Sequence, residues 1–150
     1  MAATRQRAAA GRGLQARRLA MLALFEEEFR PDQAMAALER LATEKGVGRG
    51  AAAHARDLVE GVLARRSDLD AEIARLAPAI PVSELGRVER TILRSAMFEV
   101  LYSAATPSGE TIHDAVSLAR TYAGDAARRL VSGVLTSVSR STGAQSGRGA

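Results

Sequence analysis

The sequence predicts an all-α fold, and three observations support this. Apolar residues recur along the chain at the three- and four-residue spacing of a helix, and no segment alternates convincingly in the manner of a strand. Aromatic residues make up only 3% of the chain, which together with the helical spacing points to a helical bundle. A chain of 150 residues most often forms one domain and can bury about two thirds of its unfolded surface.

Residues 85–102 form the longest helical pattern without a breaking residue, and the other helices are expected to pack around them. The apolar positions of this segment are Val88, Ile92, Leu93, Ala96, Met97, Val100 and Leu101. At 100° per residue these positions cover one broad face, which predicts a helix of the core.

Glu89 lies near the middle of that apolar face, where an unpaired carboxylate would be costly to bury. One interpretation is local. With Gly86 as the N-cap, Glu89 is at position N3, where it can reach back to the N–H of the cap and benefits from the helix dipole. The other is that Glu89 faces a groove in which a partner docks, because neither Ile92 nor Leu93 can pair with it. Both interpretations can hold together.

Six further helices are predicted from the same spacing and from the prolines, glycines and capping residues between them. They cover residues 14 to about 30, about 31 to 45, about 51 to 66, about 68 to 76, 108 to about 123 and 125 to about 139. Residues 1–13 are expected to form a basic disordered arm, and residues 141–150 a flexible tail. The sequence thus predicts seven helices, with residues 14–140 forming a single helical domain.

Two short helical segments are nearly identical. Residues 59–63 read VEGVL and residues 131–135 read VSGVL, each with a glycine inside an apolar helix. Glycine in a helix costs about 1 kcal/mol relative to alanine, so we expect both glycines to allow a close approach between helices. The repeat predicts two packed helical half-bundles; chance similarity of two short apolar motifs is the alternative.

The positive charge of the chain is concentrated at its ends. Residues 1–25 contain five arginines and no acidic residue, whereas residues 26–139 contain 14 basic and 17 acidic side chains. A mildly acidic body with a basic N-terminal arm is typical of a protein that contacts an anionic polymer along one edge. A solubilising disordered tail would have the same composition and is the alternative.

Recognisable catalytic chemistry is absent from the sequence. There is no cysteine, which fits a reducing compartment such as the cytoplasm and excludes thiolate catalysis and thiolate metal sites. His54 and His113 have no acidic residue at metal-ligand spacing, and no nucleotide-binding glycine loop or hydrolase motif occurs. We therefore expect no enzyme, cofactor, metal, membrane span or targeting segment. The remaining choice is between an RNA-binding adaptor and a module that binds only protein.

Four segments in order resemble the NusB transcription antitermination family. They are ARRLAMLALF near the start, VEGVL, LGRVERTILRSAMFEVLY, and TIHDAVSLARTYAGDAARRLVSGVL, and the resemblance covers about residues 14–140. It implies an all-α fold of two three-helix bundles. It also implies an adaptor that pairs with the ribosomal protein NusE to bind the boxA element of nascent ribosomal RNA leaders, within the antitermination complex of RNA polymerase.

The resemblance also implies which residues bind. The family's arginine-rich segment falls on residues 12–18, its RNA-facing region includes Phe25 and the start of the last helix, and its partner-facing glutamate falls on Glu89. The RNA-binding candidates are thus Arg5, Arg7, Arg12, Gln15, Arg17, Arg18, Phe25, Arg128, Arg129 and Ser132. Arg128 and Arg129 are of interest because cations in the first turn of a helix are mildly unfavourable, and phosphate contact would explain them. Two solvated arginines offset by Asp125 are the alternative.

The chain departs from the family pattern near the expected RNA path. Gly13, Leu14 and Gln15 replace part of the run of successive arginines, and Phe25 replaces a tyrosine. The family's Phe-Val-Asn-Gly motif is here residues 130–133, Leu-Val-Ser-Gly, and its Asn-Glu pair in the preceding helix is His-Asp at residues 113–114. NusB-like domains also occur in ribosomal RNA cytosine methyltransferases, so a detached domain of such an enzyme is a further alternative.

Overall fold

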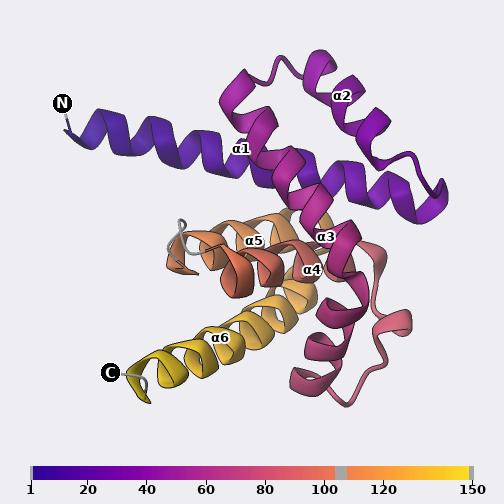
Figure 1. The fold of residues 1–150 in the computed structure, drawn as a ribbon, viewed down its shortest axis with the longest axis vertical. Coiled ribbons are helices and arrows are strands. Elements are labelled where there is room, and N and C mark those ends of the chain that lie inside the picture. The colour runs from indigo at the N-terminus through magenta and orange to yellow at the C-terminus, as the bar shows by residue number, and fades with distance from the viewer. Residues whose placement is uncertain (1, 104–107, 149–150) are drawn as a thin grey trace.

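The computed structural model describes residues 2–103 and 108–148, with side chains described for residues 11–103 and 108–142. This part of the chain contains six α-helices, one short 3-10 helix and no strand (Figure 1). The elements are α1 (Ala2–Phe29), α2 (Ala34–Glu44), α3 (Arg49–Leu76), η1 (Val82–Glu84), α4 (Arg87–Tyr102), α5 (Ser108–Ala123) and α6 (Asp125–Arg148). The all-α prediction is confirmed.

The structure has six α-helices in its described part and not the expected seven, because α3 covers both of the helices expected at about 51–66 and about 68–76. Only Arg65, with φ −124° and ψ 20°, leaves helical geometry inside α3, and it marks a kink rather than an end. Leu58, Val62, Leu69 and Ile73 are all buried and follow helical spacing across the kink. Packing of this continuous apolar face against the core keeps the two segments in one helix.

The helices form two sets of three that meet along α3 and α4. Helix α1 packs against α2 and α3, and α4, α5 and α6 pack against one another. Helix α4 also contacts both α1 and α3, so it lies at the centre of the molecule (Figure 1). The central position predicted for residues 85–102 is therefore confirmed, with Ile92, Leu93, Ala96 and Met97 buried.

One hydrophobic core extends through both sets of helices. Its largest fully buried apolar side chains are Leu19, Leu38, Leu58, Leu69, Ile73, Leu93, Met97 and Leu135. They come from α1, α2, α3, α4 and α6, and α5 adds Ala115, Leu118 and Ala119. Every helix therefore presents at least one face to the same core, as expected of a single domain.

The two repeated glycines have different surroundings. A Cβ atom on Gly61 in α3 would collide with the tip of the Phe98 ring of α4. A Cβ atom on Gly133 in α6 would meet no atom within 4 Å. The prediction of close helix approach is confirmed for Gly61 and is wrong for Gly133, which lies on an exposed face.

Helix α2 begins three residues later than expected, at Ala34 rather than Pro31. The carboxylate of Glu27 in α1 accepts hydrogen bonds from the backbone N–H groups of Asp32, Gln33 and Ala34, each at 3.1 Å. Asp32 has a positive φ of 68°, so the chain turns sharply at this point. A buried carboxylate from the neighbouring helix thus holds the turn before α2 and accepts from the first N–H of that helix.

Both terminal helices extend past the expected limits of the domain. Helix α1 begins at Ala2 instead of residue 14, and α6 continues to Arg148 instead of ending near residue 139. The side chains of residues 2–10, including Arg5 and Arg7, lie outside the described residues. The division into arm, domain and tail remains a prediction from composition.

Candidate nucleic-acid interface

Arg17 occupies the centre of a buried ion-pair network. It projects from α1, and its side chain is 5% exposed. Its Nε and Nη2 donate to the two carboxylate oxygens of Glu99 in α4, both at 2.9 Å, and Nη1 donates to Asp114 in α5 at 2.6 Å. Glu110 accepts from Nη1 at 3.3 Å, and Thr111 donates to Glu99 at 2.9 Å. The network joins α1, α4 and α5 inside the protein.

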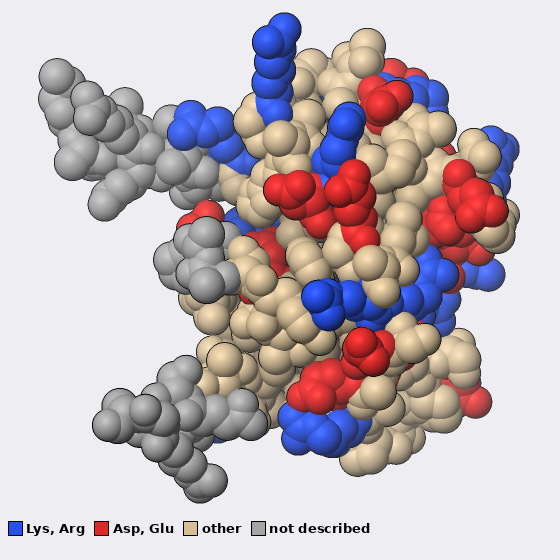
Figure 2. All heavy atoms as spheres, viewed as in Figure 1, with Lys and Arg blue, Asp and Glu red and all other residues tan. Residues whose placement is uncertain are grey.

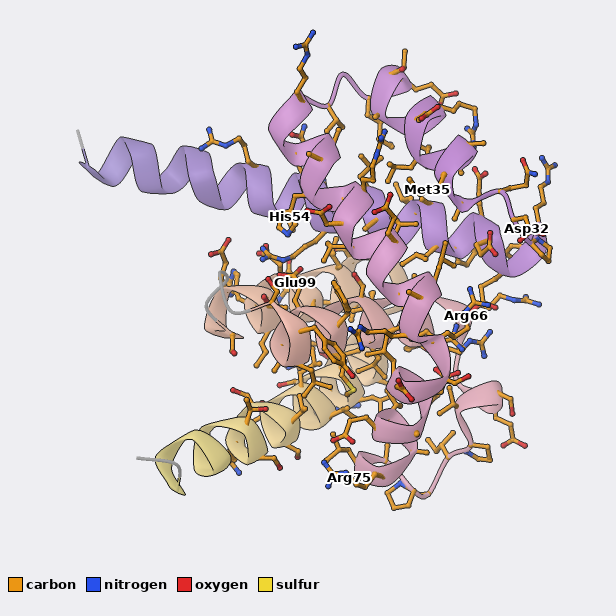
Figure 3. The ribbon with its side chains drawn as sticks, in the orientation of Figure 1. Asp32, Met35, His54, Arg66, Arg75 and Glu99 are labelled. Carbon is orange, nitrogen blue, oxygen red and sulfur yellow. The ribbon has the colours of Figure 1, made fainter. Side chains whose placement is uncertain are left out.

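The network keeps its two main members ionised. Burial alone would lower the pKa of Arg17, but the hydrogen bonds and charges of Glu99 and Asp114 raise it above its ordinary value. Burial alone would raise the pKa of Glu99, but His54, Arg17 and Thr111 lower it to about 2. Because His54 Nε2 is 3.8 Å from Glu99, beyond hydrogen-bond distance, we attribute most of this lowering to the guanidinium of Arg17 (Figure 3).

Gly13 leaves space for this network. A Cβ atom at Gly13 would lie 2.8 Å from Oε1 of Glu110 and 2.9 Å from Nη1 of Arg17. Glycine at this point therefore has a structural role, because it lets Glu110 reach Arg17 across the surface of α1.

The prediction that Arg17 contacts RNA does not fit this geometry, because its donors already bind three carboxylates. Sequence reasoning missed Glu99, Asp114 and Thr111 as its partners. The sequence did contain a sign of the role of Glu99. It follows Ile92 by seven residues and Ala96 by three, so it lies on the apolar face of α4. Arg17 and Glu99 have opposite charges and lie on the apolar faces of their helices, a combination that indicates a buried ion pair.

The other candidates of α1 remain accessible. Arg12 is exposed, and Gln15 and Arg18 are half-buried. Neither Arg12 nor Arg18 forms an ion pair or a side-chain hydrogen bond with any other residue for which side chains are described. Their guanidinium groups are therefore free to contact an external anion.

Phe25 lines an open groove between the end of α1 and α2, with a volume of about 570 Å³. Phe25 and Phe29 meet edge to face with ring centroids 5.2 Å apart. Arg30 and Arg40 also line the groove, and Arg40 pairs with Glu26. The site combines aromatic faces with basic side chains, a combination suited to stacking and phosphate contact.

The α6 candidates lie in the first turns of that helix. Arg128 and Arg129 pair with Asp125, the first residue of α6, at 2.8 and 3.1 Å. The hydrogen bond and the charge of Arg128, together with the charge of Arg129, lower the pKa of Asp125. Ser132 is half-buried one turn later. Among the described side chains, no hydrogen bond or ion pair joins these residues to the candidates of α1.

Glu89 is half-buried, and its carboxylate folds back against Gly86, the N-cap of α4. The carboxylate is thus close to the N-cap, as the local interpretation expects, but it accepts no hydrogen bond from the Gly86 N–H, so the capping role remains a prediction. The same end of α4 also has a feature of a docking site: the Arg87 guanidinium lies 4.4 Å from the centroid of the Phe29 ring, and Phe29 is 55% exposed. A large exposed aromatic ring beside charged groups is typical of a protein interface.

Two other classes of site are not found in the described part of the chain. No group of three or more His, Cys, Asp or Glu residues there could hold a metal ion. Within the same residues, no helix is long and apolar enough to cross a membrane.

Comparison with known families identifies the fold. A sequence model of the NusB family matches residues 14–140, which is most of the chain. The chain belongs to the NusB family.

Two curated relatives are named transcription antitermination protein NusB. The relative from Heliobacterium modesticaldum is 35% identical over 126 residues, which span 84% of this chain and 61% of that protein. The relative from Dehalococcoides mccartyi is 33% identical over 125 residues, which span 83% of this chain and 87% of that protein. Both names agree with the antitermination family that the sequence motifs indicated.

A solved structure supports the same assignment. A chain in the crystal structure of the antitermination factors NusB and NusE in complex with double-stranded RNA matches with a TM-score of 0.78 at 26% identity. The match covers 85% of this chain and 96% of that chain. The NusB fold of this protein is therefore supported by sequence and by structure.

Proposed function

We propose that this NusB family member is a cytoplasmic RNA-binding antitermination factor that pairs with NusE. Together they bind the boxA element of nascent ribosomal RNA leaders, as part of the RNA polymerase antitermination complex. The observation that carries the proposal is the match over nearly the whole domain to a chain from a complex of NusB, NusE and RNA.

The two alternatives have less support. A module that binds only protein would not need Arg12 and Arg18, whose guanidinium groups lack partners among the described side chains. A detached methyltransferase domain is not favoured, because the curated relatives above are antitermination proteins and one of them is matched over 87% of its length.

The RNA surface that we propose contains Arg12 and Arg18 of α1, with Arg5 and Arg7 before them, and excludes Arg17. For single-stranded RNA, each phosphate contact contributes about −0.7 to the slope of log affinity against log salt concentration, so four contacts predict about −2.8. Replacing Arg12 and Arg18 by alanine should bring the slope closer to zero by about 1.4. Affinity for a boxA RNA, measured by fluorescence anisotropy at several salt concentrations, checks this result.

Arg75→Ala is the matched control, because it removes an exposed arginine that pairs with Glu72 far along α3. Arg128→Ala with Arg129→Ala, in the same assay, tests the contribution of α6. A slope that does not change in the Arg12 and Arg18 variant would assign the RNA contact to another surface.

The partner surface that we propose is centred on Glu89 and the exposed Phe29 ring. Glu89→Gln keeps a hydrogen-bonding side chain at N3 but removes the charge, so it should weaken NusE binding by about 2 kcal/mol or more. Thermal stability should change by no more than several tenths of a kcal/mol. Calorimetric titration with NusE and thermal unfolding of the same variant measure both quantities.

Glu84→Gln in η1 is the control for this variant, because it removes an exposed carboxylate five residues earlier in the chain. If Glu89→Gln lowers the melting temperature markedly and leaves NusE affinity intact, Glu89 has only the local role.

A further inference from the structure

A second ion-pair cluster lies between α1, α3 and α4. Glu28 at the end of α1 accepts hydrogen bonds from Arg90 at 2.9 and 3.0 Å and from Arg94 at 3.2 Å. Arg94 also donates to both oxygens of Asp70 in α3, at 2.7 and 2.8 Å. Burial alone would raise the pKa of Glu28, but Arg90, Arg94 and the more distant Arg66 lower it, so this carboxylate stays charged.

Arg66 is the member of this cluster that lacks a partner. Its Nε is buried and has no hydrogen-bond acceptor, and its guanidinium forms no ion pair with any residue whose side chain is described. It lies on α3 directly after the kink at Arg65 (Figure 3). An unpaired buried donor of a charged group is costly, so an external acceptor would stabilise it.

A cavity of about 310 Å³ opens beside this unpaired group. Arg66 and the four residues of the cluster line it, and η1 forms its edge. The three arginines exceed the two carboxylates by one positive charge. Figure 2 shows basic side chains gathered across the middle of this face, with acidic side chains on either side.

We propose that this cavity binds one singly charged anionic group, the carboxylate of an acidic side chain of the protein partner. A carboxylate can accept two hydrogen bonds from a guanidinium in parallel and has the single negative charge that the cluster lacks. This inference rests on the proposed function, because it assumes a protein partner on this face.

The position of the cavity favours a protein ligand over RNA. Arg90 pairs with Glu28, and Arg87, one helical turn earlier on the same face of α4, lies over the exposed Phe29 ring, so the cavity adjoins the Phe29 part of the proposed partner surface. Arg18 and Arg12 of the proposed RNA surface, by contrast, are ten and sixteen residues before Glu28 on α1, which at 1.5 Å per residue is roughly 15 and 24 Å along the helix. One partner could therefore contact both the Phe29 ring and Arg66.

Asp32 is the internal competitor for Arg66. Both residues line a neighbouring cavity of about 430 Å³, and Asp32 is exposed. Glu27 lines the same cavity, but its carboxylate already accepts three backbone hydrogen bonds. A rotation of the Arg66 side chain into that cavity would let it pair with Asp32 without a ligand. Asp32→Asn removes this acceptor. It therefore distinguishes pairing of Arg66 with Asp32 from binding of an external carboxylate by Arg66.

The first experiment measures NusE affinity of Arg66→Gln by calorimetric titration. Loss of one member of a partly buried charge pair should weaken binding about 30-fold or more, with the melting temperature unchanged. The control Arg75→Gln removes an exposed arginine of the same helix and should bind as the unmodified protein does. Asp32→Asn should also bind normally. Normal affinity of Arg66→Gln would overturn the proposal, as would a loss confined to RNA affinity, which would indicate a phosphate ligand.

The second experiment needs no partner, and so it separates failure of this inference from failure of the proposed function. Acetate and dimethyl phosphate, both singly charged, are titrated at constant ionic strength while the Nε–H resonance of Arg66 is followed by NMR. A saturable shift with acetate that is absent from Arg66→Gln supports the site even if NusE does not bind. No saturable shift with acetate, or a shift lost in Asp32→Asn, would overturn it.

Discussion

Glu99→Gln should lower the free energy of unfolding by about 3 to 5 kcal/mol, the usual cost of removing one partner from a buried ion pair. Glu99 is 2% exposed and accepts both hydrogen bonds of the Arg17 fork. Without its charge, the buried guanidinium keeps only Asp114 and the half-exposed Glu110 as partners. Urea-induced unfolding of the variant and of the unmodified protein measures the difference.

Glu110→Gln is the matched control, because it removes a carboxylate from the same arginine at a position that is 41% exposed. An exposed pair contributes about 0 to 1 kcal/mol, so this variant should remain nearly as stable as the unmodified protein. Equal losses in the two variants would contradict a special role for the buried pair.

The same pair should make stability depend on pH. The pKa of Glu99 is lowered to about 2 from an ordinary value of 4.5. The unfolded chain therefore binds a proton at Glu99 at higher pH than the folded protein does, so the contribution to stability is complete above about pH 4.5 and is lost as pH falls towards 2. Glu99→Gln should lack this part of the acid dependence, and Glu110→Gln should retain it.

Gly61→Ala should destabilise the protein by about 1 to 3 kcal/mol, the typical cost of forcing an extra methyl group into a packed contact. The new Cβ would collide with the Phe98 ring, whose movement is restricted by its stacking on Tyr102 at a centroid distance of 5.7 Å. The contact joins α3 to α4, so the loss should appear in the global unfolding transition measured by urea.

Gly133→Ala is its control within the repeated motif. No atom lies within 4 Å of the added methyl group, so the higher helix propensity of alanine should stabilise the protein by up to about 1 kcal/mol. The two substitutions are chemically identical and should have opposite signs. Equal effects would mean that helix propensity, and not the contact with Phe98, determines both results.

The features that the sequence alone determined are those that depend on local spacing. The helical period of residues 85–102 predicted the core helix α4, and the four ordered motifs indicated the NusB family, which the match to residues 14–140 confirms. The basic composition of the N-terminal segment likewise pointed to an anionic ligand, because charge can be counted without knowing the fold.

The tertiary structure determined which charged groups pair inside the protein and which remain at the surface. Arg17 and Arg18 are neighbours in sequence, yet the rotation of about 100° between successive helical residues directs Arg17 to Glu99 inside the protein and leaves Arg18 near the surface. The pairing of α1 with α4 also selected Glu99 rather than Glu89 as the buried acid. The packing of α3 on α4 places Gly61, but not Gly133, against a neighbouring ring. It also leaves the buried Nε of Arg66 beside an open cavity with no acceptor among the described residues. Local spacing specifies which face a residue occupies, whereas its partner depends on which other helix covers that face.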